Sequence, residues 1–347
     1  WFRLRHFVGK EADMTIRESL ELREKEYLSP YASLSMNTKG RLKPEEECDI
    51  RPAFQRDRDK ILHCKAFRRL KDKTQVFLSP EGDHYRTRLT HTLEVSQNAR
   101  TIAKALKLNE DLVEAIALGH DLGHTPFGHA GERALNRVCP LGFEHSQQSV
   151  RTVDRLERHG QGLNLTYEVR DGILNHQTIG KPHTLEGKVV RLSDKISYIH
   201  HDMDDAVRAG ILKESDVPEN IRSVIGCTPS ERLDHFVHDI VTNSMGKNDI
   251  CMSEPIARAM KDMRQFMFDN VYQNPVAKSE EGKAEMLMET LYQHFMKHID
   301  ELPEEFLNLL SEGEPREQVI CDYVGAMTDR FAISLYEEIY IPKSWGI

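Results

Sequence analysis

The sequence lacks several features that would place a protein in a membrane or outside the cell. No apolar run approaches the roughly 18 residues that a membrane-spanning helix needs. Residues 1–7 have neither the apolar stretch nor the small-residue cleavage site of a signal peptide. The six cysteines are scattered and form no Cys-x-x-Cys pair, so neither a disulfide framework nor a zinc knuckle is indicated. These absences predict a cytoplasmic protein with no membrane partner.

Common motifs of nucleotide binding and of serine hydrolases are also missing. Gly123 and Gly128 have the spacing of a P-loop, but His-Ala follows them where Lys-Ser/Thr is required. No Gly-x-Gly-x-x-Gly follows an expected strand, and the sequence has no Gly-x-Ser-x-Gly nucleophile elbow. Any phosphate or ester chemistry must therefore use a different set of residues.

What is present is typical of a globular protein with a substantial core. The chain has 347 residues, of which 39% are hydrophobic and 30% charged, and its net charge of -9 argues against a general polyanion binder. Residues 51–73 nevertheless carry nine Lys or Arg against three Asp. This segment is either a solvated helix face with local Arg–Asp pairs or a positive field for a phosphate-rich ligand.

The apolar periodicity predicts a chain that is helical almost throughout. A capping box at 15–18 predicts a helix towards Tyr27, and Asn109 is a plausible cap for a helix that ends at His120. Other helices are expected at about 86–106, 186–208, 255–272, 280–299 and 314–338, with a loop at 33–52. The one strand signal is 74–78, as an arm of a short β-hairpin. The predicted parts are an N-terminal arm (1–50), a catalytic core (51–210) and a C-terminal helical region (211–347).

The run 119–129, Gly-His-Asp-Leu-Gly-His-Thr-Pro-Phe-Gly-His, is the most informative segment. His120 and Asp121 offer an imidazole nitrogen and a carboxylate oxygen to the same divalent cation. Gly123 and Pro126 interrupt the helical pattern, so the histidines at 124 and 129 can turn back over that ion. His91 on the preceding helix is a candidate third ligand.

A further candidate ligand lies on the helix expected at 186–208. Asp194, Tyr198 and Asp202 are spaced at i, i+4 and i+8 and therefore share one face. Acidic residues on one helix face are usually solvated. The preceding apolar turn, 189–192, places Asp194 near the boundary of the core, where a carboxylate needs a partner such as a cation.

These residues resemble a known family. His91, His120-Asp121 and Asp194 form the H…HD…D pattern of the HD-domain phosphohydrolases. The longer motifs at 56–63, 66–77, 86–95, 119–132 and 322–332 resemble those of the deoxynucleoside triphosphate (dNTP) triphosphohydrolases, and the resemblance extends from about residue 30 to 340. It implies an all-α HD-domain helical bundle with additional N- and C-terminal helices. It also implies a reaction in which a dNTP and water give a deoxynucleoside and inorganic triphosphate, which controls dNTP pools.

The resemblance also implies roles for individual residues. The metal would be held by His91, His120, Asp121 and Asp194, and could be Mn, Mg, Fe, Co, Ni or Zn. The implied catalytic residues are His124 paired with Glu132 around the water, His129 as the acid for the leaving 5′ oxygen, and His145 facing the phosphates. The carboxylate is Glu here where some relatives have Asp. The implied substrate contacts are Arg88 and Lys195 to phosphate, and Tyr198, Asp202 and Gln75 to the deoxyribose.

Several alternatives stay open from the sequence. The chain could be another HD phosphohydrolase, acting on a nucleoside monophosphate, a cyclic nucleotide or (p)ppGpp, or a dNTP-sensing or nucleic-acid-binding protein. His129 and His145 could instead hold a second metal. Relatives suggest a homo-oligomer, a second dNTP as activator and weak binding of single-stranded nucleic acid. The segment 322–332 is expected to be a buried helix that braces the core or a subunit contact. No role is assigned to the remaining histidines, which include His176, His183, His200 and His201.

Overall fold

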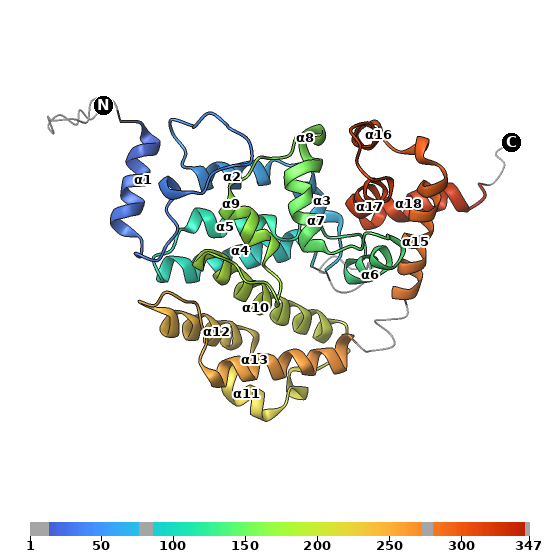
Figure 1. Cartoon of the computed structure of the whole chain (residues 1–347). Coiled ribbons are helices and arrows are strands. Elements are labelled where there is room, and N and C mark those ends of the chain that lie inside the picture. Colours follow the sequence, from blue (N-terminus) through green and yellow to red (C-terminus); the bar gives the residue numbers. More distant parts are fainter. Residues whose placement is uncertain (1–13, 76–85, 273–279, 344–347) are drawn as a thin grey trace, which may run out of the picture.

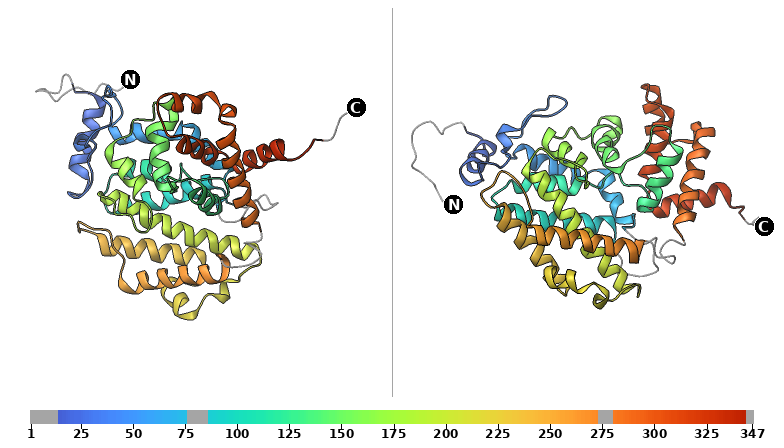
Figure 2. Two further views of the ribbon diagram at one scale, coloured as in Figure 1. Left: turned by 45° about the vertical axis from the view of Figure 1, so that its right-hand side comes forward. Right: turned by 60° about the horizontal axis from the view of Figure 1, so that its bottom comes forward.

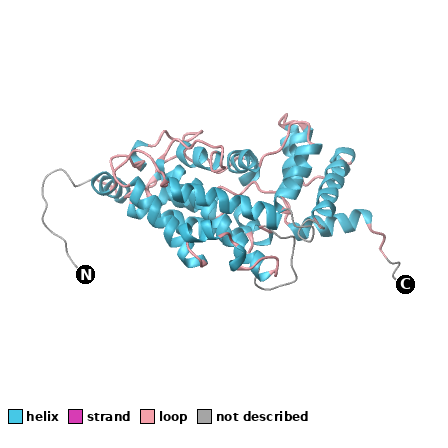
Figure 3. Ribbon diagram, turned by 90° about the horizontal axis from the view of Figure 1, so that it is seen from below, coloured by secondary structure: helices cyan, strands magenta, loops and turns pink. Residues whose placement is uncertain are grey.

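The computed structural model describes residues 14–75, 86–272 and 280–343, and over these ranges the chain is helical (Figures 1 and 3). The prediction of an all-α fold is confirmed. Extended pairing within the described ranges is limited to two isolated bridges, Arg41 with Thr166 and Thr74 with Thr87. The second bridge lies at the foot of the predicted hairpin, whose residues 76–78 fall outside the described ranges. No described helix is long and apolar enough to cross a membrane.

Most helices follow one another with short connections, but a long segment, 28–52, separates α1 from α2. The first part of the chain contains α1 (Ile16–Tyr27), α2 (Ala53–Leu62), α3 (Lys65–Arg69), α4 (Arg88–Ala105), α5 (Glu110–Gly119), α6 (Gly128–Val138), α7 (His145–Arg151), α8 (Glu157–Gly160), α9 (Tyr167–Leu174) and α10 (Leu185–Arg208). The second part contains α11 (Glu219–Ile225), α12 (Pro229–Ser244), α13 (Glu254–Met267), α15 (Glu281–Lys297), α16 (Glu304–Ser311), α17 (Arg316–Ala326) and α18 (Asp329–Tyr340). Two π-helical turns, Thr152–Leu156 and Phe268–Tyr272, extend α7 and α13.

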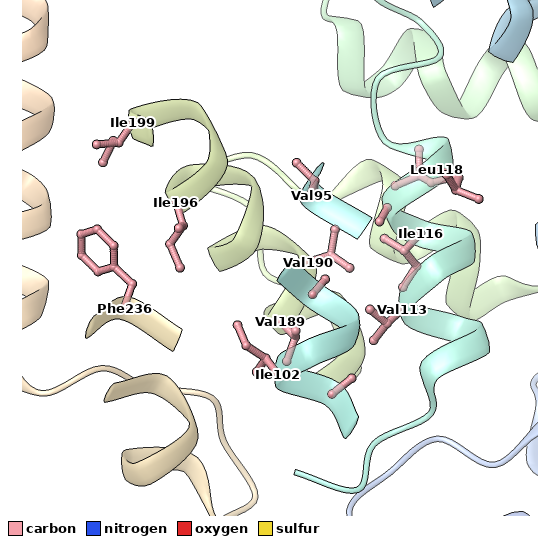
Figure 4. Close-up of a cluster of buried hydrophobic side chains, with 14 of the residues drawn as sticks. Val95, Ile102, Val113, Ile116, Leu118, Val189, Val190, Ile196, Ile199 and Phe236 are labelled. Atoms are coloured by element: carbon pink, nitrogen blue, oxygen red, sulfur yellow. The ribbon is translucent and has the colours of Figure 1, made fainter. Parts of the chain in front are cut away.

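The main apolar core lies where α4, α5 and α10 pack together, with α2 and α9 against α5 (Figure 4). Val95 and Ile102 of α4 are fully buried because they recur on the inner face of the helix. Val113 and Ile116 of α5 meet Val190 of α10 in the same layer (Figure 4). The helices α12 and α13 cover the outer side of α10, and α11 packs against these two helices (Figures 1 and 2). This packing fixes the three helices that carry the predicted metal ligands.

A second apolar core joins α6 to the C-terminal helices. Ala134 and Leu135 of α6 pack with Met288 and Leu291 of α15 and with residues of α17. In Figure 2 these helices stand together at one side of the molecule. The helix that carries Glu132 is therefore supported from the C-terminal part of the chain, not only from its neighbours in sequence.

The predicted helix ends agree with the structure in most places. Thr15 forms the expected capping box with Glu18, and Asn109 caps α5 by accepting a hydrogen bond from the N–H of Leu112 at 3.2 Å. The expectation of one continuous helix over 314–338 was wrong. The chain breaks after α17, and the Thr328 hydroxyl caps the new helix α18 by accepting from the N–H of Phe331.

Candidate active site

The turn between α5 and α6 packs closely against α7, because Gly123 has no side chain and Ser149 has a small one. A Cβ atom on Gly123 would collide with the backbone nitrogen of Ser149, so only glycine allows this approach. The N–H of Gly123 donates to the Ser149 hydroxyl at 2.9 Å, and that hydroxyl donates to the carbonyl of His120 at 2.7 Å. The turn therefore brings His120 and Asp121 back into the helical core.

The four predicted metal ligands come together from three helices. His91 lies on α4, His120 and Asp121 follow α5, and Asp194 lies on α10. Asp194 Oδ1 is 3.1 Å from His91 Nε2 and 3.7 Å from His120 Nε2, and His120 Nε2 is 3.6 Å from Asp121 Oδ1. Donor atoms that each lie about 2.0–2.2 Å from one ion are separated by distances of this size. The geometry thus suits a divalent cation.

The chemistry of the donor atoms also fits a cation. His120 Nδ1 donates to the carbonyl of Ala117 at 2.6 Å, so Nε2 carries the lone pair, and this buried nitrogen has no hydrogen-bond partner among the described residues. Burial opposes ionisation of Asp194, but the hydrogen bond with His91 and the neighbouring histidine charges lower its pKa to about 2. The set therefore offers free lone pairs and an ionised carboxylate.

The orientation of His91 depends on His201, a histidine for which no role was predicted from the sequence. His201 Nδ1 lies 3.3 Å from His91 Nδ1, and His201 Nε2 contacts the carboxylate of Glu94. Because a carboxylate can only accept, His201 carries its proton on Nε2 and accepts from His91 through Nδ1. His91 Nε2 then faces Asp194 Oδ1 at 3.1 Å, where either a proton on Nε2 or a shared metal ion would join the two groups. No spacing rule in the sequence indicated this contact, because it joins two separate helices.

Arg88 contacts a predicted metal ligand and also lines the cavity beside it. Its side chain is buried, and Nη1 donates to Asp121 Oδ2 at 2.7 Å. The predicted phosphate-binding arginine therefore also fixes one of the predicted metal ligands. Arg88 lines the cavity as well, so its guanidinium faces both the carboxylate and the space for a substrate.

The predicted catalytic residues form a compact group around Glu132. Glu132 Oε1 accepts from the backbone N–H and from Nδ1 of His145, each at 2.9 Å, and Oε2 accepts from His129 Nδ1 at 3.0 Å. The ring of His124 stacks on that of His145, with centroids 4.3 Å apart. The described residues show no hydrogen bond between Glu132 and His124. The resemblance paired these two residues, whereas the hydrogen bonds of Glu132 go to His129 and His145.

The charges in this group are strongly coupled. Burial disfavours the Glu132 carboxylate, but hydrogen bonds from His129 and His145 outweigh it and hold its pKa far below the usual range. Burial also opposes the charged form of His145, yet the hydrogen bond with Glu132 raises its pKa. His124 has the opposite behaviour: burial, followed by the nearby charge of Arg88, lowers its pKa well below the usual value. The site thus places an imidazole whose pKa is lowered beside one whose pKa is raised.

His176 joins the same centre, although the sequence analysis assigned it no role. Its Nδ1 donates to the carbonyl of Ile173 at 2.7 Å, so the lone pair is on Nε2, which lies 3.2 Å from His145 Nε2. Since His145 donates through Nδ1 to Glu132, a positive charge is required between the two Nε2 atoms: a second proton on His145 or a metal ion. Asp121, His145 and His176 could also share an ion, because their donor atoms lie within 4.8 Å of one another.

A cavity of about 660 Å³ opens over these residues. Four of the predicted substrate contacts line it: Gln75, Arg88, Lys195 and Tyr198. Asp202 does not line it; the carboxylate is fully buried and accepts from the hydroxyl of Tyr272, whose ring stacks on that of Tyr198. Burial raises the pKa of Asp202 to about 7.

The cavity also contains residues that the sequence analysis did not single out. Lys261 and Arg264 reach it from α13, and Gln177 and Thr178 reach it from the segment after α9. Nothing in the periodicity of α13 distinguished these two cations from solvated ones. They are found only because α13 packs beside α10.

The basic segment 51–73 is largely neutralised by neighbouring acids. Its ion pairs include Arg51 with Asp59, Arg56 and Lys60 with Glu45, Arg58 with Asp111 and Lys65 with Glu305. No residue of this segment is among the described residues that line the large cavity. The geometry favours the interpretation of local ion pairs over that of a phosphate-attracting field.

Comparison with known protein families gives the class of protein. A model described as "HD domain" matches residues 88–199, which contain all four candidate metal ligands. A second model, described as "Phosphohydrolase-associated domain", matches residues 250–338 and thus includes Lys261 and Arg264. The helical fold, the histidine–aspartate centre and these matches define an HD-domain, metal-dependent phosphohydrolase.

Similar proteins narrow this class further. A protein of Caldanaerobacter subterraneus, named deoxyguanosinetriphosphate triphosphohydrolase-like protein, is 55% identical over 96% of this chain and 98% of its own. Proteins with the same name from Desulfatibacillum aliphaticivorans and Clostridium perfringens are each 48% identical over 95% of this chain and 99% of their own. The chain belongs to the family of deoxyguanosinetriphosphate triphosphohydrolase-like proteins. A crystal structure of a phosphohydrolase from Bacteroides thetaiotaomicron shares the fold, with a TM-score of 0.51 and 16% identity over 81% of this chain and 67% of that one.

Proposed function

We propose that this protein hydrolyses dNTPs to a deoxynucleoside and inorganic triphosphate, and thereby controls dNTP pools. The observation that carries the proposal is the composition of one cavity. It combines the histidine–aspartate centre with the cationic side chains of Lys195, Lys261 and Arg264 and with the ring of Tyr198. The name of the relatives supports a nucleoside triphosphate as the substrate.

The cationic side of the cavity suits a triphosphate. Burial, together with the nearby charges of Arg191 and Arg264, lowers the pKa of Lys195. An anion placed between Lys195 and Arg264 would relieve this repulsion, because each cation would gain a partner of opposite charge. A chain of three phosphates can contact these groups while its first phosphate lies at the histidine–aspartate centre.

The deoxyribose is placed beside Tyr198 and Gln75, which both line the cavity. The Oε1 atom of Gln75 is buried and has no hydrogen-bond partner among the described residues, so it is available to a sugar hydroxyl. Asp202 does not line the cavity, and its carboxylate already accepts from the hydroxyl of Tyr272. We infer that Asp202 supports the stacked pair of Tyr198 and Tyr272.

In the proposed reaction, water attacks the α-phosphorus and the bond from that atom to the 5′ oxygen breaks. A divalent ion held by His91, His120, Asp121 and Asp194 would neutralise charge on the α-phosphate and make the water more acidic. The low pKa of His124 keeps its imidazole neutral and able to accept a proton. The leaving 5′ oxygen needs a proton, and the histidines bound to Glu132 can hold one; the resemblance favours His129 for this step.

Product analysis tests the proposal directly. The full chain is incubated with each of the four dNTPs, singly and in mixtures, with Mn(II) or Mg(II), and the products are separated by chromatography. The Asp121→Ala and His124→Ala variants are run in parallel, with His183→Ala as a control at an exposed histidine that does not line the cavity. We expect deoxynucleoside and intact triphosphate from the wild type and the control, and neither product from the two site variants.

Other outcomes would redirect the assignment. Diphosphate or monophosphate as the inorganic product would contradict cleavage at the α-phosphorus. Turnover of a nucleoside monophosphate, a cyclic nucleotide or (p)ppGpp, without turnover of a dNTP, would indicate a different HD phosphohydrolase. Turnover that occurs only in mixtures would support a second dNTP as activator. Gel filtration and a salt titration of single-stranded DNA binding would test the expected oligomer and the weak nucleic-acid binding.

A further inference from the structure

The turn that carries His124 and His129 has an unusual backbone. Phe127 and Gly128 are consecutive residues with positive φ angles of 60° and 57°. Glycine adopts this left-handed conformation readily, whereas phenylalanine does so only when its surroundings hold it there. The turn also ends directly at α6, whose first residues include His129. Contacts that hold Phe127 therefore influence where both histidines lie.

One buried carboxylate from the far end of the chain makes such a contact. Asp329 Oδ1 accepts from the N–H of Phe127 at 3.0 Å. Its other oxygen, Oδ2, accepts from the N–H of Thr74 at 2.9 Å and from the Thr74 hydroxyl at 2.6 Å. Asp329 is only 6% exposed. A single side chain thus joins the catalytic turn to the segment that leads to Gln75.

A second contact links the same C-terminal segment to the turn. The ammonium group of Lys73, which is 2% exposed, donates to the carbonyl of His124 and to the carbonyl of Gly325 in α17. A buried ammonium needs several acceptors, and here it finds one in the turn and one in the C-terminal helix. The backbone of His124 is therefore fixed from the C-terminal side as well.

The segment 322–332 also reaches the helix that carries His145. Asp322 accepts from Arg151 Nε at 2.8 Å and from Gln148 Nε2 at 2.9 Å, and both donors lie on α7. The break between α17 and α18 places Asp322 and Asp329 on two different helices, and each carboxylate contacts a different part of the candidate site.

A purely local role for Asp329 would be to stabilise its own helix. An acidic residue in the first turn of a helix interacts favourably with the free N–H groups there. The three hydrogen bonds described above go instead to two other segments, about 200 and 255 residues away in the sequence. The direction of these bonds indicates a role in holding the turn.

We propose that Asp329 is a positioning residue for the active site, which holds the 124–129 turn in the conformation that hydrolysis requires. This inference rests on the proposed function, since it assigns a task to a residue that touches neither substrate nor metal. It also gives the C-terminal helices a part in catalysis: they complete the catalytic turn rather than only cover the core.

The test compares Asp329→Asn and Asp329→Ala with a control, Glu314→Gln. Asparagine retains one acceptor oxygen, so it can keep the Phe127 bond or those of Thr74 but not all three. Glu314 is also an acid of the C-terminal region and binds Arg151 and Arg155, but it does not contact the turn. The measurements are kcat and KM with a dNTP, metal per chain, and hydrogen exchange of peptides that cover 120–132.

We expect kcat to fall about ten-fold in Asp329→Asn and about a hundred-fold in Asp329→Ala, because small displacements of catalytic groups have effects of this size. Metal content should stay within about two-fold of the wild type, and KM should change less than kcat, since Asp329 contacts neither the substrate cavity nor a candidate metal ligand. Exchange at 124–129 should become faster in both variants. Glu314→Gln should resemble the wild type in all four measurements.

The proposal is overturned if both Asp329 variants retain the wild-type kcat, or if kcat falls only in proportion to lost metal or lost folded protein. Hydrogen exchange keeps this test separate from that of the proposed function. If the wild type hydrolyses no dNTP, faster exchange confined to 124–129 in the Asp329 variants still supports the inference that Asp329 holds the turn in place. Unchanged exchange there would contradict it.

Discussion

Replacing Glu132 by Gln offers the sharpest test of how the site controls its protons. The carboxylate accepts two hydrogen bonds from His145 and one from His129, so its negative charge is shared by both imidazoles. Glutamine has nearly the same shape and can still accept through its amide oxygen. The substitution therefore removes charge while leaving much of the packing in place.

The size of the effect follows from the hydrogen bonds that lose their charge. A hydrogen bond to a charged group contributes about 1.5–3 kcal/mol, against about 0.5–1.5 kcal/mol for a neutral one. The loss for the Nδ1 bonds of His129 and His145 is then about 1–2 kcal/mol each. Together the two bonds lose about 2–4 kcal/mol, and because about 1.4 kcal/mol corresponds to a factor of ten, kcat should fall about 30- to 900-fold near neutral pH. KM should change little, since Glu132 does not line the cavity.

The pH profile gives the sign of the effect. In the wild type, burial lowers the pKa of His145, but the hydrogen bond with Glu132 outweighs it and raises the pKa. In Glu132→Gln the charge of Glu132 is lost while the burial remains, so the pKa of His145 falls. If a protonated histidine of this pair serves the leaving oxygen, activity is lost as pH rises through its pKa, and the alkaline limb of the profile moves to lower pH.

The assay is steady-state hydrolysis of a dNTP between about pH 5.5 and 9.5, with metal per chain measured for each sample. Glu314→Gln serves as the control, because it removes a partly buried carboxylate that binds Arg151 and does not contact the turn. An alkaline limb that stays in place in Glu132→Gln would refute the reasoning, whatever the change in kcat. A fall in metal content equal to the fall in kcat would assign Glu132 to metal retention instead.

Three further predictions concern the metal, the turn and the core. His120→Ala should lose bound metal, as measured by elemental analysis of dialysed protein, whereas His183→Ala should retain it; equal metal in both would remove His120 from the ligand set. Gly123→Ala should lower the free energy of unfolding by about 1–3 kcal/mol, because the new Cβ collides with Ser149, and an unchanged urea midpoint would contradict this. The pKa of Asp202 is raised to about 7, so the folded protein binds more protons than the unfolded chain between about pH 4 and 7, and this part of the stability is present at pH 4 and lost by pH 7. Between about pH 4 and 7 the free energy of unfolding should therefore fall less in Asp202→Asn than in the wild type, by up to about 4 kcal/mol. An equal fall in both proteins, measured by urea unfolding at each pH, would argue against this.

The sequence was sufficient to predict the fold class and the helices that carry the candidate metal ligands. Periodic apolar residues and a side-chain cap located α4 and α5 to within two residues. The HD pair and the resemblance indicated which side chains converge, and the structure brings His91, His120, Asp121 and Asp194 together as expected. Their roles stay predictions until metal and products are measured.

Residues that act across helices were not predictable in the same way. His176 and His201 have no distinctive spacing, and their importance depends on which nitrogen of a neighbouring ring faces them. Lys261 lies on α13, and only the packing of α13 beside α10 brings it to the cavity. A one-dimensional pattern shows which face of a helix is buried, but not what lies opposite that face.

The candidate site depends on segments that lie far apart in the sequence. The histidine–aspartate centre lies within residues 88–199, but the cavity above it is completed by Lys261 and Arg264, and its catalytic turn is bound by Asp329. A chain shortened after α10 would keep all four candidate metal ligands, yet it would lack Lys261 and Arg264, two of the cations proposed for the triphosphate, and the carboxylate that binds Phe127. The two matched regions therefore contribute to one cavity, in which the first contains the candidate metal ligands and the second adds Lys261 and Arg264.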